Sequence, residues 1–137
     1  MNNFIKVSHK HEDNILYCNK ENIQAVVETK KGGCCIYHPN SKKKSLIVLN
    51  TFEELKHNLL DFVLVTLYPN NARALIDLKK VLTLSSCDNG TFLATDNIWL
   101  SNRARGFTAK ETIAEIMCQV QAMEDKKEER YINDKIT

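Results

Sequence analysis

Glycine and proline are scarce in this chain of 137 residues, which holds four glycines and two prolines. Residues that break regular structure are therefore few. No apolar run is long enough to cross a bilayer as a helix, and the N-terminal residues lack the basic and apolar segments of a secretory signal. We therefore expect a protein that does not enter the membrane.

Paired cysteines are also lacking. The five cysteines are an odd number and form no Cys-x-x-Cys sequence, a pattern that favours reduced thiols in a cytoplasmic protein. A small, buried hydrophobic side chain is the simplest interpretation of each of them. They are Cys18, Cys34, Cys35, Cys87 and Cys118.

An excess of charge of one sign is absent as well, since 19 basic residues stand against 17 acidic ones and the formal charge is +2. This balance is too weak to predict nucleic-acid binding from charge alone. Apolar residues make up 43% and charged residues 26% of the chain, close to globular averages, which excludes wholesale disorder and fibrous folds.

What the sequence does contain is an internal similarity between its two halves. A shift of 58 positions aligns the apolar segments that begin at Phe4 and Phe62. The same shift aligns Gly32 with Gly90, each after a polar turn and before a new apolar run. This order of matching features predicts an internal duplication.

Two Thr-x-x-Glu sequences, which begin at Thr51 and Thr108, come into register at a shift of 57. Each is typical of a capping box, in which the Thr hydroxyl and the Glu carboxylate bond to free amides of the first helical turn. We predict one compact domain of residues 1–127 with two repeat units, 4–60 and 62–123. A charged helix end and tail are predicted at 124–137.

The predicted fold class is α+β, with two duplicated antiparallel β-meander units, each closed by a helix, and the C-terminal helix longer. Short apolar runs between polar turns favour strands, and apolar residues at helical spacing favour the helices. The predicted strands are residues 4–8, 15–19, 23–28, 34–38 and 45–49 in the first unit and 62–67, 74–78, 81–85, 91–94 and 97–101 in the second.

One stretch reads Ile-Leu-Tyr-Cys-Asn-Lys-Glu-Asn-Ile and is followed by a glycine turn, two strands and a Thr-Phe-Glu-Glu-Leu helix start. This order resembles the FlbD-like family of small flagellar and swarming proteins, whose single unit has the same meander and helix. The resemblance covers the first unit and, more loosely, the second. It implies a structural or assembly partner of the flagellar type.

Residues 4–116 also resemble the LytTR DNA-binding domain. Residues 51–55 are similar to its middle helix, residues 74–81 to its Val-Asn strand and residues 100–103 to its Val-Ser-Arg end. Its usual Arg-x-His-Arg-Ser segment has no counterpart at 63–67. This resemblance implies the alternative function of a DNA-binding transcriptional regulator.

The two units differ most in the approach to the second capping sequence, where only unit 2 carries two arginines and a glycine. Guanidinium groups beside a helix N-terminus suit an anion. We predict a non-catalytic protein that binds a small anionic, nucleotide- or phosphate-bearing ligand there; the alternative is that the arginines pair with acidic surface groups. The site residues are Asn102, Arg103, Arg105, Gly106 and Thr108.

Two hairpin tips are rich in lysine and would form a phosphate patch if the hairpins lie side by side. Solvated turn lysines, which also protect sheet edges, are the alternative interpretation. With this patch, the LytTR-like protein would contact DNA phosphates. The lysines are Lys30, Lys31, Lys42, Lys43 and Lys44.

Catalytic and metal-binding patterns are not evident. His9 and His11 share one face of an extended segment but lack a third ligand, so we predict no metal and no cofactor. No Ser-His-Asp order, phosphate loop or carboxylate pair is present, so we expect the protein not to be an enzyme.

The second helix carries an apolar stripe that runs beyond the length of the first helix. Its distal residues, Met117, Val120 and Met123, have no evident partner within the chain. Exposed apolar surface costs about 25 cal/mol per Å². We therefore predict a homodimer through these three side chains; the alternative is that the stripe packs on its own sheet.

Overall fold

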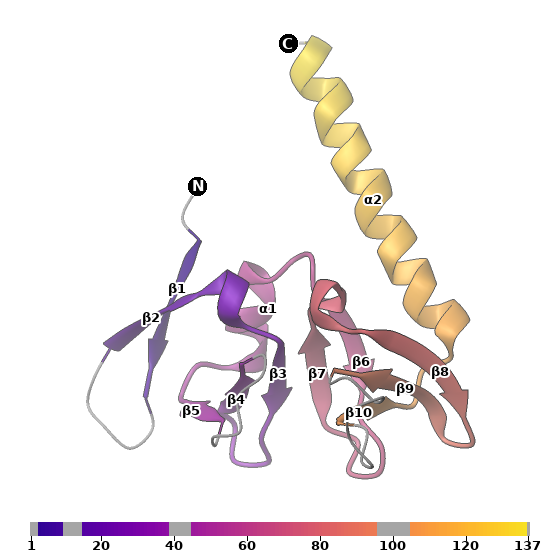
Figure 1. Cartoon of the computed structure of the whole chain (residues 1–137). Helices are drawn as coiled ribbons and strands as arrows, with labels where there is room; N and C mark the ends of the chain where they lie inside the picture. The colour runs from indigo at the N-terminus through magenta and orange to yellow at the C-terminus, as the bar shows by residue number, and fades with distance from the viewer. Residues whose placement is uncertain (1–2, 10–14, 39–44, 96–104, 137) are drawn as a thin grey trace.

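The computed structural model describes residues 3–9, 15–38, 45–95 and 105–136 of the chain. These residues form antiparallel sheets of short strands and two α-helices, of which the C-terminal one is long (Figure 1). The α+β class predicted from the sequence is confirmed. In the described part of the chain, no helix combines the length and the apolarity that crossing a membrane requires.

The first half of the described chain ends in a short helix. Its elements are β1 (Phe4–Ser8), β2 (Ile15–Asn19), the 3-10 turn η1 (Lys20–Asn22), β3 (Ala25–Glu28), β4 (Cys34–Tyr37), β5 (Leu46–Val48) and α1 (Phe52–Asn58). Thr51 caps α1 as predicted, because its Oγ1 accepts a hydrogen bond from the Glu54 N–H at 3.2 Å.

The second half has the same kinds of element in the same order. They are β6 (Val63–Thr66), β7 (Arg73–Ile76), the 3-10 turn η2 (Leu78–Lys80), β8 (Thr83–Cys87), β9 (Gly90–Ala94), β10 (Gly106–Ala109) and α2 (Ile113–Ile136). Helix α2 has 24 residues and spans about 36 Å. Its C-terminal part projects away from the sheets (Figure 1).

The strands form one continuous series. The central sheet has the order β5-β4-β3-β7-β6, and the sheets β1-β2 and β10-β9-β8 lie beyond its two edges. Single bridges, His9–Val48 and Leu67–Ala109, connect β1 to β5 and β6 to β10. The whole order is therefore β2-β1-β5-β4-β3-β7-β6-β10-β9-β8. The two halves meet where β3 pairs with β7. An uninterrupted meander would also pair β2 with β3 and β7 with β8, and neither of these pairs forms among the described strands.

Corresponding strands pair in corresponding register. The pair Ile5↔Cys18 of β1·β2 has its counterpart in Val63↔Ile76 of β6·β7, at an offset of 58 in both strands. Both 3-10 turns are capped in the same way, because the side chains of Asn19 and Asp77 each accept a hydrogen bond from the N–H two residues later. Strand β4 corresponds to β9 at an offset of 57.

One matching position differs from the expected one. Gly90 corresponds to Gly33, one residue beyond the predicted Gly32, because a Cβ at Gly33 would strike the carbonyl oxygen of Val48 and a Cβ at Gly90 that of Ala109. Close packing between neighbouring strands therefore requires glycine at both positions. A duplicated origin for the halves stays a prediction.

Two cores lie on opposite faces of the central sheet. The first contains Leu55 of α1 and side chains of β1, β3, β4 and β5, and the second contains Ile116 of α2 and side chains of β6, β7, β9 and β10. Leu55 and Ile116 occupy corresponding helix positions, and both are buried. Each such side chain contributes about 1.5–3 kcal/mol to folding by its burial.

The premise of the predicted helix interface is corrected by this packing. Val120 and Met123 are half-buried and pack against the second core, so they have partners within the chain. Met117 is exposed. The alternative interpretation of the stripe therefore holds for two of its three residues, and a dimer through α2 stays a prediction without its original argument.

Candidate functional site

The predicted anion site is not assembled at a helix start. Gly106 and Thr108 belong to β10, where they pair with Ala94 and Phe92 of β9. Arg105 is exposed and directly precedes β10, about 17 Å along the extended chain from Lys110, near which α2 begins. Asn102 and Arg103 lie outside the described residues. The prediction that Arg105, Gly106 and Thr108 approach a helix N-terminus is therefore wrong.

The error arises because two Thr-x-x-Glu sequences follow each other. The capping box of α2 is the second one, in which Thr112 Oγ1 accepts from the Glu115 N–H at 3.2 Å and Glu115 Oε1 accepts from the Thr112 N–H at 3.1 Å. Glu111 instead accepts a hydrogen bond from the N–H of Thr66, the last residue of β6, at 2.8 Å. Gly106 is required by strand packing, because a Cβ there would strike the Leu93 carbonyl oxygen.

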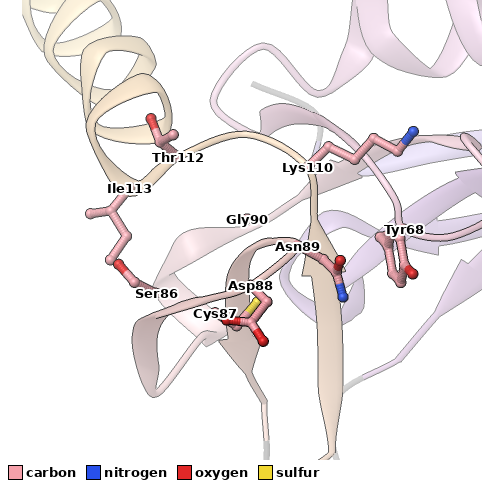
Figure 2. Close-up of a pocket in the computed structure, with 9 residues that line it drawn as sticks. All are labelled: Tyr68, Ser86, Cys87, Asp88, Asn89, Gly90, Lys110, Thr112 and Ile113. Carbon is pink, nitrogen blue, oxygen red and sulfur yellow. The ribbon is translucent and has the colours of Figure 1, made fainter.

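A groove of about 560 Å³ lies where α2 begins (Figure 2). The turn between β8 and β9, the segment between β10 and α2, and Tyr68 form its walls. It opens widely to solvent. Its lining residues are Tyr68, Ser86, Cys87, Asp88, Asn89, Gly90, Lys110, Thr112 and Ile113.

The groove carries charges of both signs. Within the described residues, neither the Lys110 ammonium nor the Asp88 carboxylate has a hydrogen-bond or ion-pair partner. The two side chains point in different directions in Figure 2. In the same view the Lys110 side chain points away from the start of α2. In the sequence, the polar turn that ends at Gly90 is the signal that marks this groove, and by itself it predicts only a turn.

The lysine patch can be placed only in part. Lys30 and Lys31 are exposed at the turn between β3 and β4. Lys42, Lys43 and Lys44 lie outside the described residues, so the side-by-side arrangement of the tips, and with it the DNA-binding alternative, stays a prediction. Within the described residues, no group of three or more His, Cys, Asp and Glu side chains could hold a metal ion.

The thiols of Cys18 and Cys34 are poor nucleophiles at neutral pH, because burial keeps them protonated. Burial raises the pKa of Cys34 to about 12, and burial also raises the pKa of Cys18. All five cysteines are free.

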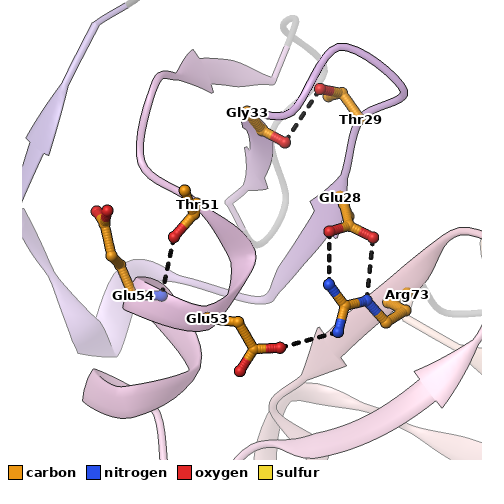
Figure 3. Close-up of polar contacts among 7 residues, drawn as sticks. All are labelled: Glu28, Thr29, Gly33, Thr51, Glu53, Glu54 and Arg73. Atoms are coloured by element: carbon orange, nitrogen blue, oxygen red, sulfur yellow. Dashed lines mark hydrogen bonds and ion pairs between the residues drawn. The ribbon is translucent and has the colours of Figure 1, made fainter.

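Arg73 fastens the junction at which the two halves meet (Figure 3). Its guanidinium donates to both carboxylate oxygens of Glu28, at 3.0 and 2.7 Å, and to Glu53 of α1 at 2.9 Å. It also stacks over the Phe52 ring, 4.6 Å from the centroid. The hydrogen bonds from Arg73 hold the pKa of Glu28 below its usual value.

A second polar contact closes the other end of the junction. The Lys80 ammonium donates to Asp77 at 2.8 Å and to the Ile23 carbonyl at 2.9 Å, and the Asp77 carboxylate is buried. Together with the Arg73 contacts, this pair brackets the short β3·β7 ladder.

The two ends of the strand series form a second candidate site. Strand β2 pairs only with β1, and β8 only with β9, among the described strands. Each therefore presents backbone N–H and C=O groups along one edge. Large apolar side chains lie exposed on or beside these edges, namely Ile15, Tyr17 and Leu82. Sequence patterns identified the strands but not which of them would end the series.

No family model, curated protein or solved structure matches this chain.

Proposed function

We propose that this chain is a non-catalytic, homo-oligomeric binding protein that assembles through the open edges of β2 and β8. One observation carries the proposal: both edges are unpaired among the described strands and carry exposed apolar side chains, among them Tyr17 at 62% and Leu82 at 59% exposure. Monomeric proteins usually protect open edges with charge, bulges or a covering segment. The five free thiols favour the cytoplasm as the place of action.

Light scattering and hydrogen exchange test this function. The wild-type mass should rise with concentration, and the amides of β2 and β8 should become more protected as it rises. A variant with lysine at Ile15, Tyr17, Leu82 and Ser85, all exposed, should remain monomeric. The matched control places lysine at Leu49 and Leu60, which are equally exposed but lie outside both edges, and should associate like the wild type.

Two results would contradict the proposal. One is a wild type that stays monomeric up to millimolar concentration. The other is association that the four edge lysines leave intact but that Met117→Lys abolishes, because the interface would then lie on α2.

A small anionic ligand in the groove is a second candidate function, favoured by the Lys110 ammonium, which lines the groove and has no partner among the described residues. Titration with inorganic phosphate and with a nucleotide, followed by NMR, should shift the amides near Lys110. Lys110→Ala should remove these shifts, and Lys127→Ala, an exposed change further along α2, should keep them. Equal shifts in both variants would exclude the groove.

A further inference from the structure

The β3·β7 junction joins the first half of the chain to the second by strand pairing. Strand β3 is the third strand of the first half and β7 is the second strand of the second half. They pair antiparallel with Ala25 opposite Ile76, Val26 opposite Leu75 and Val27 opposite Ala74. The ladder thus joins the third strand of one unit to the second strand of its successor.

The strands that correspond to this pair are the two that remain open. Strand β8 corresponds to β3, because Leu82 N donates to the Ala94 carbonyl at 2.8 Å as Gln24 N donates to that of Tyr37 at 2.8 Å. Strand β2 corresponds to β7, as the shared register of the two hairpins requires. The open edge of β8 is therefore built like the β3 side of the junction, and the open edge of β2 is built like its β7 side.

The side chains on these edges are exposed where their counterparts are buried. Leu75 of β7 is 1% exposed and its counterpart Tyr17 is 62% exposed. Gln24 before β3 is 7% exposed and its counterpart Leu82 is 59% exposed. Apolar side chains thus occupy positions that a further strand would cover.

We infer that a second copy of this chain docks head to tail, with β8 of one protomer pairing antiparallel with β2 of the next in the register of β3·β7. The inference rests on the proposed edge assembly and specifies its partner strands. The junction register transfers to Thr83 opposite Cys18, Leu84 opposite Tyr17 and Ser85 opposite Leu16.

The cores support this register. Val26 and Leu75, from the two sides of the junction, both lie in the first core. Leu84, the counterpart of Val26, packs against the second core. Tyr17 of the next copy would therefore extend the second core as Leu75 extends the first.

The partner is a second copy and not the same chain, because β2 and β8 lie at opposite ends of the strand series (Figure 1). A head-to-tail contact leaves one β2 edge and one β8 edge open after each addition, so the product is a ring or an open filament. The contact should be reversible, because the positions corresponding to Arg73 and Glu28 hold Ile15 and Ser86 and cannot form the ion pairs of the junction.

Disulfide cross-linking tests the register with a native thiol. In a background with serine at Cys35, Cys87 and Cys118, the variant Thr83→Cys places a thiol opposite Cys18 of the next copy. Paired Cα atoms of antiparallel strands lie about 4.5–5.5 Å apart, within the range of disulfides. Mild oxidation should give a ladder of disulfide-linked multimers on a non-reducing gel.

Ser85→Cys is the matched control, because it lies two residues further along the same exposed strand, where the diagonal distance to Cys18 is about 7–8 Å. It should cross-link several-fold less, and Cys18→Ser should abolish the ladder of Thr83→Cys. Equal cross-linking of the two variants, or a ladder that survives Cys18→Ser, would overturn the register. If the wild type still associates and the amides of β2 and β8 become protected, only the proposed register is overturned. If the wild type does not associate, the proposed function is overturned as well.

Discussion

The β3·β7 junction and the open edges of β2 and β8 consist of corresponding strands in different surroundings. At the junction, Val26 and Leu75 are buried and Arg73 ties both strands to α1. On the open edges the corresponding side chains are half-buried or exposed, and no comparable ion cluster is possible. The place of a strand in the series, and not its local fold, therefore decides whether its side chains belong to a core.

The largest expected contrast is between Leu75→Ala and Tyr17→Ala, two truncations at corresponding positions. Leu75 is buried in the first core, so its loss should lower the free energy of unfolding by about 2–5 kcal/mol. Tyr17 is exposed, and its truncation should change stability by less than about 0.5 kcal/mol. Urea unfolding of dilute protein measures both, and similar losses would remove the distinction between junction and edge.

A second contrast concerns the glycines. Gly33→Ala should cost about 1–3 kcal/mol through overpacking against the Val48 carbonyl. Gly90→Ala should cost more, because it meets the Ala109 carbonyl and also has a φ of +134°. Gly32→Ala, with open space around its Cβ but a φ of +100°, should cost about 1 kcal/mol. Thermal unfolding ranks the three, and a Gly32 variant as damaged as the other two would contradict the assigned correspondence.

The two consecutive Thr-x-x-Glu sequences that begin at Thr108 and Thr112 give a third contrast. Thr112 caps α2, so Thr112→Ala should lower stability by about 1 kcal/mol. Thr108 lies in β10 and caps nothing, so Thr108→Ala should have a smaller effect. Circular dichroism during urea unfolding would detect the difference, and the reverse order would restore a helix start at Thr108.

The ion cluster at the junction has the smallest expected effect, because its charges are partly exposed. Arg73→Met should cost less than about 1 kcal/mol at neutral pH. The pKa of Glu28 is lowered in the folded protein, so its contribution is present at neutral pH and is lost as the pH falls through the acidic range. Arg73→Met should flatten this part of the stability profile, whereas Lys79→Met, at a longer and more exposed ion pair, should leave it unchanged.

Local sequence signals placed much of the chain correctly. The predicted strands 4–8 and 15–19 coincide with β1 and β2, and the cap at Thr51 is confirmed. These features depend on side-chain alternation and on hydrogen bonds between near neighbours, both of which a sequence displays.

The remaining errors concern interactions between distant residues. Pairing of β3 with β7 joins residues about fifty positions apart, and no local pattern encodes which strands meet. The predicted strand 97–101 lies wholly outside the described residues. Residues 106–109, which include part of the predicted ligand site, form β10. The helix therefore begins one turn later than the predicted start at Thr108. The argument that placed the ligand at a helix start no longer holds, and ligand binding itself stays a prediction.

Mixing two edge-blocked variants tests head-to-tail pairing most directly. The β2-blocked variant carries lysine at Ile15 and Tyr17, and the β8-blocked variant carries lysine at Leu82 and Ser85, all of which are exposed. By light scattering, each variant alone should be monomeric, and their equimolar mixture should form a dimer and nothing larger. A β2-blocked or β8-blocked variant that dimerises alone, or a mixture that stays monomeric while the wild type associates, would contradict the head-to-tail account.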